Sequence, residues 1–162
     1  MFGLSSPPAI IRPFAQKDAR ACYAVFRDAV LWGTAPHYAL DEREAWAGPA
    51  HMPADWTARL DEQITWVAQG SRARIEGFLT VGHDGHIDFF YIAPARRGTG
   101  LAARLYEQAE AHCRAQGLTI MTTAASHLAR AFLTRRGWQT EARQSVIRAS
   151  VAITNFRMSK TI

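Results

Sequence analysis

One segment of the chain joins a strand, a glycine-rich turn and a long helix without interruption. Residues 91–117 read YIAPARRGTGLAARLYEQAEAHCRAQG, in which a strand-like run ends at Pro94 and Gly117 ends a helix predicted over 98–116. Residues at a spacing of four form an apolar stripe on this helix: Leu101, Leu105, Ala109 and Cys113. A further strand is predicted over 118–125. The segment therefore predicts a strand–helix–strand crossover, which carries the chain across one face of a β-sheet.

The rest of the chain predicts short strands separated by turns and helices. Further strands are expected at 9–14, 64–69, 73–82 and 86–93, and as a pair after Gly137. Helices are expected over about 17–32, from about Asp41 and over 128–137, with a short turn within 53–62. This order predicts an α/β (α+β) fold in one domain, residues 1–162. Its sheet should be mixed and mostly antiparallel, with about six to seven strands and helices on both faces.

Composition narrows the classes of partner. The net charge of +5 comes almost entirely from scattered arginines, since Lys17 and Lys160 are the only lysines, so nucleic acid is not the expected partner. No apolar run approaches the roughly 18 residues of a membrane span, and no secretory leader is recognised at the N-terminus. Cys22 and Cys113 lie far apart without a CxxC motif, which favours a cytoplasmic location. The oligomeric state is left open, a homodimer included.

The turn at residues 96–100 has the features of a phosphate site. The first turn of a helix carries unpaired N–H groups and partial positive charge, and glycines let an anion approach them. Arg96 and Arg97 add full charge. The alternative is an ordinary strand-to-helix turn with solvated arginines. GTGLAA (98–103) also fits the dinucleotide fingerprint, but the strand at 118–125 offers no carboxylate for a ribose and antiparallel strands precede the turn, so that interpretation is not favoured.

Two motifs resemble those of a known family. RGTGLA (97–102) matches the pattern Q/R-x-x-G-x-G/A and resembles the pyrophosphate loop of the GNAT superfamily, the acetyl-CoA-dependent N-acetyltransferases. SHLARAFLTRRGW (126–138) resembles the later family pattern N-x-x-A-x-x-F-Y-x-x-x-G-F. The resemblance covers essentially the whole chain. The residues HY…AW (37–46) and TNFRM (154–158) further suggest the YafP-like branch.

The resemblance implies how the co-substrate acetyl-CoA would bind. Two central strands would splay apart, and the pantetheine arm would lie in the gap and pair with the strand edge around Tyr91 and Ile92. The diphosphate would lie on the N–H groups of Arg97 through Ala102. Ser126 takes the position of the family's Asn, and Phe132 would pack against the thiol end. The implied coenzyme-binding residues are Tyr91, Ile92, Arg96, Arg97, Gly98, Thr99, Gly100, Leu101, Ala102, Ser126 and Phe132.

Acetyl transfer to an amine needs a base and an acid. His86 and Asp88 lie two residues apart on one strand face and are the candidate base; the alternative is that both are structural. The family's tyrosine acid falls at Leu133, which cannot donate a proton. Tyr91, His127 or Tyr38 could replace it, or the thiolate could leave into water. For Tyr91 the alternative is packing on the opposite face of the strand.

The acceptor pocket is expected between the first helices and the last strands. His37, Tyr38, Trp56 and Asn155 are its predicted residues, although tryptophans at such positions are often core residues. No His, Cys or carboxylate spacing indicates a metal. The expected function is transfer of an acetyl group to a primary amine of a small molecule or peptide, by direct attack in a ternary complex. The alternative is a non-catalytic acyl-CoA-binding sensor, and the acceptor itself is left open.

Overall fold

A computed structural model describes residues 7–162 of the chain. Its centre is one seven-stranded sheet with the order β1-β2-β3-β4-β5-β7-β6. The strands are β1 Ile10–Pro13, β2 Ile64–Gln69, β3 Ile75–Val81, β4 His86–Ile92, β5 Ile120–Ala125, β6 Gln139–Arg148 and β7 Val151–Thr161. Only β4 and β5 pair in parallel within this sheet, on either side of the crossover helix. The predicted mixed, mostly antiparallel α/β fold is therefore confirmed.

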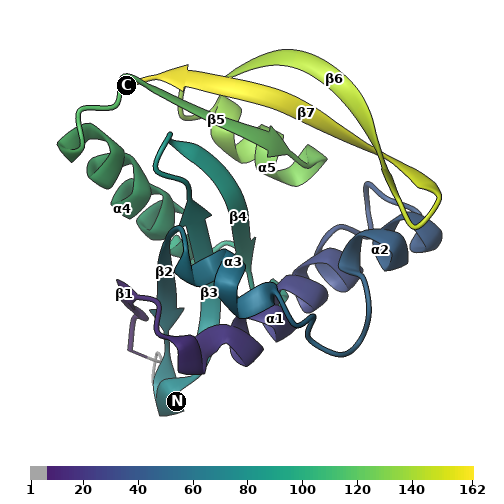
Figure 1. The fold of residues 1–162 in the computed structure, drawn as a ribbon, viewed down its shortest axis with the longest axis horizontal. Helices are drawn as coiled ribbons and strands as arrows, with labels where there is room; N and C mark the ends of the chain where they lie inside the picture. The colour runs from purple at the N-terminus through teal and green to yellow at the C-terminus, as the bar shows by residue number, and fades with distance from the viewer. Residues whose placement is uncertain (1–6) are drawn as a thin grey trace, which may run out of the picture.

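Helices cover both faces of the sheet (Figure 1). They are α1 Ala19–Asp28, α2 Leu40–Ala47, α3 Trp56–Asp61, α4 Leu101–Ala115 and α5 His127–Thr134. One apolar core lies under α4 and α5 around Leu105 and Met121, and the other lies under α1 and α3 around Phe78. The chain also contains four short helical turns: η1 Gln16–Asp18, η2 Ala29–Gly33, η3 Ser71–Ala73 and η4 Pro94–Arg96.

Two predicted helix boundaries were wrong for local reasons. The helix expected over 98–116 begins only at Leu101, because Gly98 and Gly100 have φ angles of +77° and +84°, outside the helical region. The helix expected over 17–32 is divided into η1, α1 and the single π-helical turn η2. In that turn the Thr34 hydroxyl donates to the Val30 carbonyl over 2.6 Å.

Strands β4 and β5 separate in the middle of the sheet. Their ladder has two residue pairs, His86 with Thr122 and Ile87 with Thr123, and the strands diverge beyond it (Figure 1). Strand β4 also contains a β-bulge opposite β3, because Thr80 pairs with Phe89 and Val81 pairs with Ile87. Asp88 is therefore an extra residue in β4, and side-chain alternation changes phase at this point.

A polar network joins α4 to β7 on the outer side of the first core. Glu110 of α4 pairs with Lys160 of β7 over 2.9 Å and with Arg114 over 2.7 Å, and it accepts a hydrogen bond from the Tyr106 hydroxyl. Trp138 Nε1 donates to the same hydroxyl over 2.9 Å. Burial alone would raise the pKa of Glu110, but these hydrogen bonds outweigh it and lower the pKa to about 2. The carboxylate is therefore charged wherever the protein is folded at neutral pH.

Within residues 7–162, no helix has the length and apolar character needed to cross a bilayer.

Candidate functional site

The turn before α4 presents open backbone. Gly100 is the N-cap residue of α4, and no side chain caps the helix there. A β-carbon added at Gly98 or Gly100 would meet no atom of the described residues within 4 Å. The first N–H groups of this 15-residue helix therefore face open space, together with the positive end of its dipole. This backbone can accept an anionic group such as a diphosphate.

The two arginines of this turn hold it in place. Arg96 forms an ion pair with the buried Glu76 of β3, with 2.8 Å between Nη2 and Oε1. Arg97 Nη1 donates to the Gly33 carbonyl at the end of η2 over 2.8 Å. The Thr99 hydroxyl donates to the Arg96 carbonyl over 2.6 Å. Both guanidinium groups therefore have partners within the protein, and Arg96 and Arg97 also line the cavity described next.

A cavity of about 500 Å³ extends from this turn into the gap between β4 and β5. It is lined by Gly98, Gly100, Leu101 and Ala102 at one end and by Ser126 and Phe132 of the α5 region at the other. The sequence interpretation missed Arg135 and Arg136, which also line it. The Arg136 guanidinium lies 3.7 Å from the centre of the Phe132 ring. The letters TRRG at the end of the α5 pattern are the sequence feature that could have identified these two arginines.

The backbone of β4 faces this cavity through alternate residues. The Ala93 N–H donates to the Glu76 carbonyl, and Tyr91 is two residues away in the same ladder with β3. Residues two apart in an antiparallel strand direct their amides to the same side. The Tyr91 amide therefore faces β3, whereas the amides of Phe90 and Ile92 face the gap. The sequence interpretation expected the pantetheine arm to pair with the backbone at Tyr91 and Ile92. The Ile92 amide does face the gap, but the other amide of this stretch that faces it is that of Phe90, not that of Tyr91.

Ser126 is the N-cap residue of α5. Its Oγ accepts a hydrogen bond from the Ala129 N–H over 3.1 Å. A serine hydroxyl that accepts one hydrogen bond still has a proton to donate. Phe132 packs against Phe90, with 5.5 Å between ring centroids. Phe132 lies on α5 and Phe90 lies on β4, so this contact joins the two walls of the gap.

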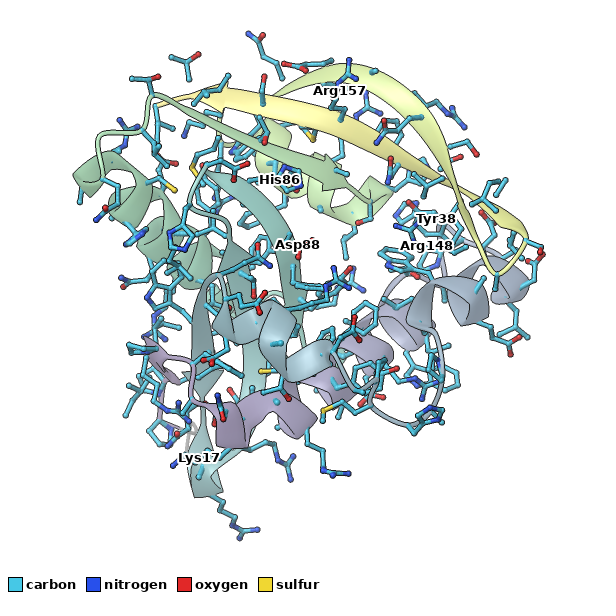
Figure 2. The ribbon with its side chains drawn as sticks, viewed as in Figure 1. Lys17, Tyr38, His86, Asp88, Arg148 and Arg157 are labelled. Carbon is cyan, nitrogen blue, oxygen red and sulfur yellow. The ribbon has the colours of Figure 1, made fainter. Side chains whose placement is uncertain are left out.

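A second cavity, of about 320 Å³, lies on the other side of this gap. It shares Trp46, Tyr91 and Ser126 with the first cavity. His86 and Asp88 line it from β4, as Figure 2 shows. The two cavities therefore meet at a common wall, which a group bound in either cavity could reach.

His86 and Asp88 each have a protein partner. His86 Nδ1 shares a hydrogen bond of 2.8 Å with the Thr122 hydroxyl. Asp88 Oδ2 accepts from Gln63 Nε2 over 2.9 Å and lies 3.4 Å from Arg59 Nη2. Both side chains line the same cavity, so their expected placement on one face agrees with the structure. The partners orient these groups without removing them from the cavity.

The candidate acids differ in their surroundings. The Tyr91 ring packs against Phe26 with centroids 5.0 Å apart, and burial raises the pKa of its hydroxyl. The Tyr38 hydroxyl donates to the Thr154 carbonyl over 2.7 Å and accepts from the His127 N–H over 3.2 Å. Burial and the adjacent His37 lower the pKa of the His127 ring. Burial raises the pKa of the Tyr38 hydroxyl as well, so both tyrosines keep their protons at neutral pH, and Tyr91 is the one that lines both cavities.

The predicted acceptor residues divide into two groups. Tyr38, Trp56 and Asn155 line the second cavity. Trp56 is also a core residue, 3% exposed, whose Nε1 donates to the Ala19 carbonyl over 2.9 Å. His37 is not among the residues that line this cavity: its side chain is exposed, and its ring stacks on His127 with centroids 5.5 Å apart. Leu133, at the family's tyrosine position, is buried in the core under α5 and is 1% exposed.

Among residues 7–162, no three His, Cys, Asp or Glu side chains are grouped so that they could hold a metal ion.

Comparison with known proteins identifies the family. Residues 34–160 match the model of the acetyltransferase (GNAT) domain. The chain is 28% identical over 149 residues to YafP, an uncharacterized N-acetyltransferase of Escherichia coli K12, covering 91% of this chain and 93% of that one. It superposes on a GCN5-related N-acetyltransferase from Rhodopseudomonas palustris with a TM-score of 0.90 and 29% identity, over 98% of this chain and 99% of that chain. PaiA N-acetyltransferase from Thermoplasma acidophilum, solved with coenzyme A, gives a TM-score of 0.74 and 16% identity, over 96% and 100% of the two chains.

Proposed function

Because the chain belongs to the GNAT family of acetyltransferases, we propose that it transfers the acetyl group of acetyl-CoA to a primary amine by direct attack in a ternary complex. The observation that carries this proposal is the common wall of Trp46, Tyr91 and Ser126 between the two cavities. A thioester in the first cavity and an amine in the second would meet there without a covalent enzyme intermediate.

The first cavity is the proposed site of acetyl-CoA. The diphosphate binds the N–H groups from Gly98 to Ala102, where the turn is open and the helix dipole is favourable. The amides of the pantetheine arm pair with the edge of β4 at Phe90 and Ile92, as an added strand would. Ser126 Oγ–H donates to the arm from the opposite wall. The coenzyme-bound PaiA structure shares the fold that places these elements.

The second cavity is the proposed site of the amine. The amine nitrogen attacks the thioester carbonyl carbon, and its surplus proton passes to Asp88 or His86, directly or through a water molecule. The main-chain N–H groups of β4 beside the carbonyl stabilise the oxyanion. As the carbon–sulfur bond breaks, Tyr91 donates its proton to the departing thiolate, and the proton released from the amine returns through Asp88 or His86 and water to restore the neutral tyrosine. The raised pKa of Tyr91 keeps that proton in place at neutral pH.

A second candidate function follows from Leu133. Leu133 stands where the family pattern has the tyrosine that acts as the acid, and leucine cannot donate a proton. A protein that binds acyl-CoA without catalysis would not need this acid. The two functions are separated by offering a panel of amines with acetyl-CoA and measuring free thiol. An acetyltransferase releases coenzyme A in proportion to the amine, whereas a sensor binds acetyl-CoA in calorimetry and releases no thiol that depends on amine. Thiol release at the same rate with and without amine would contradict the proposed transfer.

A further inference from the structure

The second cavity carries an excess of positive charge. The charged side chains that line it are Arg59, Asp88 and Arg148. Arg59 already has partners within the protein, because it pairs with Asp88 at 3.4 Å and its guanidinium lies 4.7 Å from the centre of the Phe89 ring. Arg148 has one hydrogen bond within residues 7–162, from Nη1 to the Ile147 carbonyl over 3.2 Å, and no carboxylate partner there. One guanidinium in this cavity is therefore available to a ligand.

The position of Arg148 is set by a tight turn. It is the last residue of β6, and the two residues that follow, Ala149 and Ser150, have φ angles of +46° and +64°. A two-residue hairpin loop of this type requires positive φ at both of its central residues, so the tight turn fixes where β6 ends. Figure 1 shows the tip of this hairpin beside α2. Figure 2 shows Arg148 and Tyr38 across the open space from His86 and Asp88.

Asn155 supplies a second polar group to the same cavity. Its Oδ1 is buried and has no hydrogen-bond partner among residues 7–162. Asn155 pairs with Gln144 on β6, so it lies on the same hairpin as Arg148. A buried carbonyl oxygen without a donor is costly, and an N–H group of a ligand would satisfy it. The hairpin thus presents one cation and one acceptor to whatever fills the cavity.

The volume of the second cavity and its aromatic wall indicate the size and the apolar character of the ligand. Its volume of about 320 Å³ lies near the lower end of the range for small-molecule sites, roughly 300–1,000 Å³. Aromatic side chains, among them Tyr23, Phe26 and Trp56, form the wall on the α1 and α3 side. These features fit a molecule of amino-acid size with an apolar part.

From these observations, and resting on the proposed acetyl transfer, we infer that the acceptor is an amine that also carries a carboxylate, such as an amino acid with an apolar side chain. Arg148 binds the carboxylate, and Asn155 Oδ1 accepts a hydrogen bond from the amine, which thereby points to the common wall with the acetyl-CoA cavity. Polyamines and other multiply cationic amines are poor acceptors, because Asp88 is already paired with Arg59 and the remaining charge repels them.

The experiment compares three matched acceptors: phenylalanine, phenylalaninamide and phenylethylamine. Thiol release gives kcat/KM for each, and we expect the carboxylate to exceed the amide by about tenfold or more, since a charge-assisted pair is lost in the amide. In Arg148→Gln the ratio of the two kcat/KM values should fall by about tenfold. Arg157→Gln is the matched control, because Arg157 is on β7 of the same hairpin but pairs with Glu141 at 3.4 Å outside the cavity. It should keep the wild-type ratio.

The outcomes separate the two proposals. Turnover of polyamines or phenylethylamine without preference for the carboxylate would overturn the inference and leave acetyl transfer to amines intact. An unchanged ratio in Arg148→Gln would also overturn it. Binding of acetyl-CoA with no thiol release for any amine would instead overturn the proposed function, and the inference with it.

Discussion

Replacing Gly100 with aspartate tests the coenzyme turn while leaving the core untouched. Gly100 has a φ of +84° and caps α4, and an added β-carbon would meet no described atom within 4 Å. The new carboxylate would therefore occupy the open space before the first turn of α4. This is the space in which we place the diphosphate of acetyl-CoA.

Gly117 offers a matched control at the other end of α4. It has a φ of +77° and equally open surroundings among the described residues. A residue with a β-carbon in the left-handed region costs about 1–2 kcal/mol at either position. The helix dipole favours a carboxylate at the N-terminus by about 0.3–1 kcal/mol and disfavours it at the C-terminus by a similar amount. Gly117→Asp should therefore be the less stable variant by about 1 kcal/mol.

Coenzyme affinity should follow the opposite order. Two like unit charges 4 Å apart repel by about 4 kcal/mol at an effective dielectric constant of about 20, which corresponds to about a thousandfold in affinity. Isothermal titration calorimetry should thus show acetyl-CoA binding about a thousandfold weaker in Gly100→Asp and unchanged in Gly117→Asp. Urea unfolding of both variants establishes that they fold. An affinity of Gly100→Asp within tenfold of wild type would refute the placement of the diphosphate.

Three further outcomes are expected. Asp88→Asn should lower kcat by about tenfold to a hundredfold and change its pH profile, with acetyl-CoA affinity unchanged in calorimetry; a wild-type kcat would place the base elsewhere. Glu110→Gln should lower the free energy of unfolding by about 2 kcal/mol at pH 7, because the charge that pairs with Lys160 is lost. Since the pKa of Glu110 is lowered to about 2, this difference should persist above pH 4.5 and shrink as the pH falls toward 2, in urea titrations at several pH values; a constant difference would contradict the ion pair. Replacing Ala149 with Asn and Ser150 with Gly should raise the free energy of unfolding by about 1 kcal/mol, because Asn-Gly suits two left-handed positions; a loss of stability would show that the turn is not strained.

The sequence predicted the order of elements because each element carries its own periodicity and end signals. The crossover through residues 91–117 is the clearest case, since a stripe at a spacing of four and Gly117 define α4 without any tertiary information. Its start was misplaced by three residues because the motif does not reveal that Gly98 and Gly100 adopt left-handed conformations. Local pattern therefore identifies an element more reliably than its ends.

The site was predicted less completely because long side chains choose partners from distant parts of the chain. Arg96 and Arg97 lie beside the expected anion site, yet they bind Glu76 and the Gly33 carbonyl. His37 lies next to Tyr38 in the sequence but turns outward onto His127. Arg148 belongs to no motif and reaches the cavity only through the hairpin turn. Such placements follow from tertiary packing, which residue spacing does not encode.

The extra residue in β4 has a consequence for any change in the length of this strand. In a regular strand, odd-numbered Tyr91 and even-numbered Asp88 would project from opposite sides, yet both reach the amine cavity here because the strand slips by one position between them. Deleting Ile87 would leave Asp88 and Tyr91 three residues apart in a regular strand, which would put the proposed proton acceptor and proton donor on opposite sides of the sheet. If Asp88 and Tyr91 act as proposed, a change of one residue in the length of β4 would separate the two groups, whereas a substitution at either position would leave the other in place.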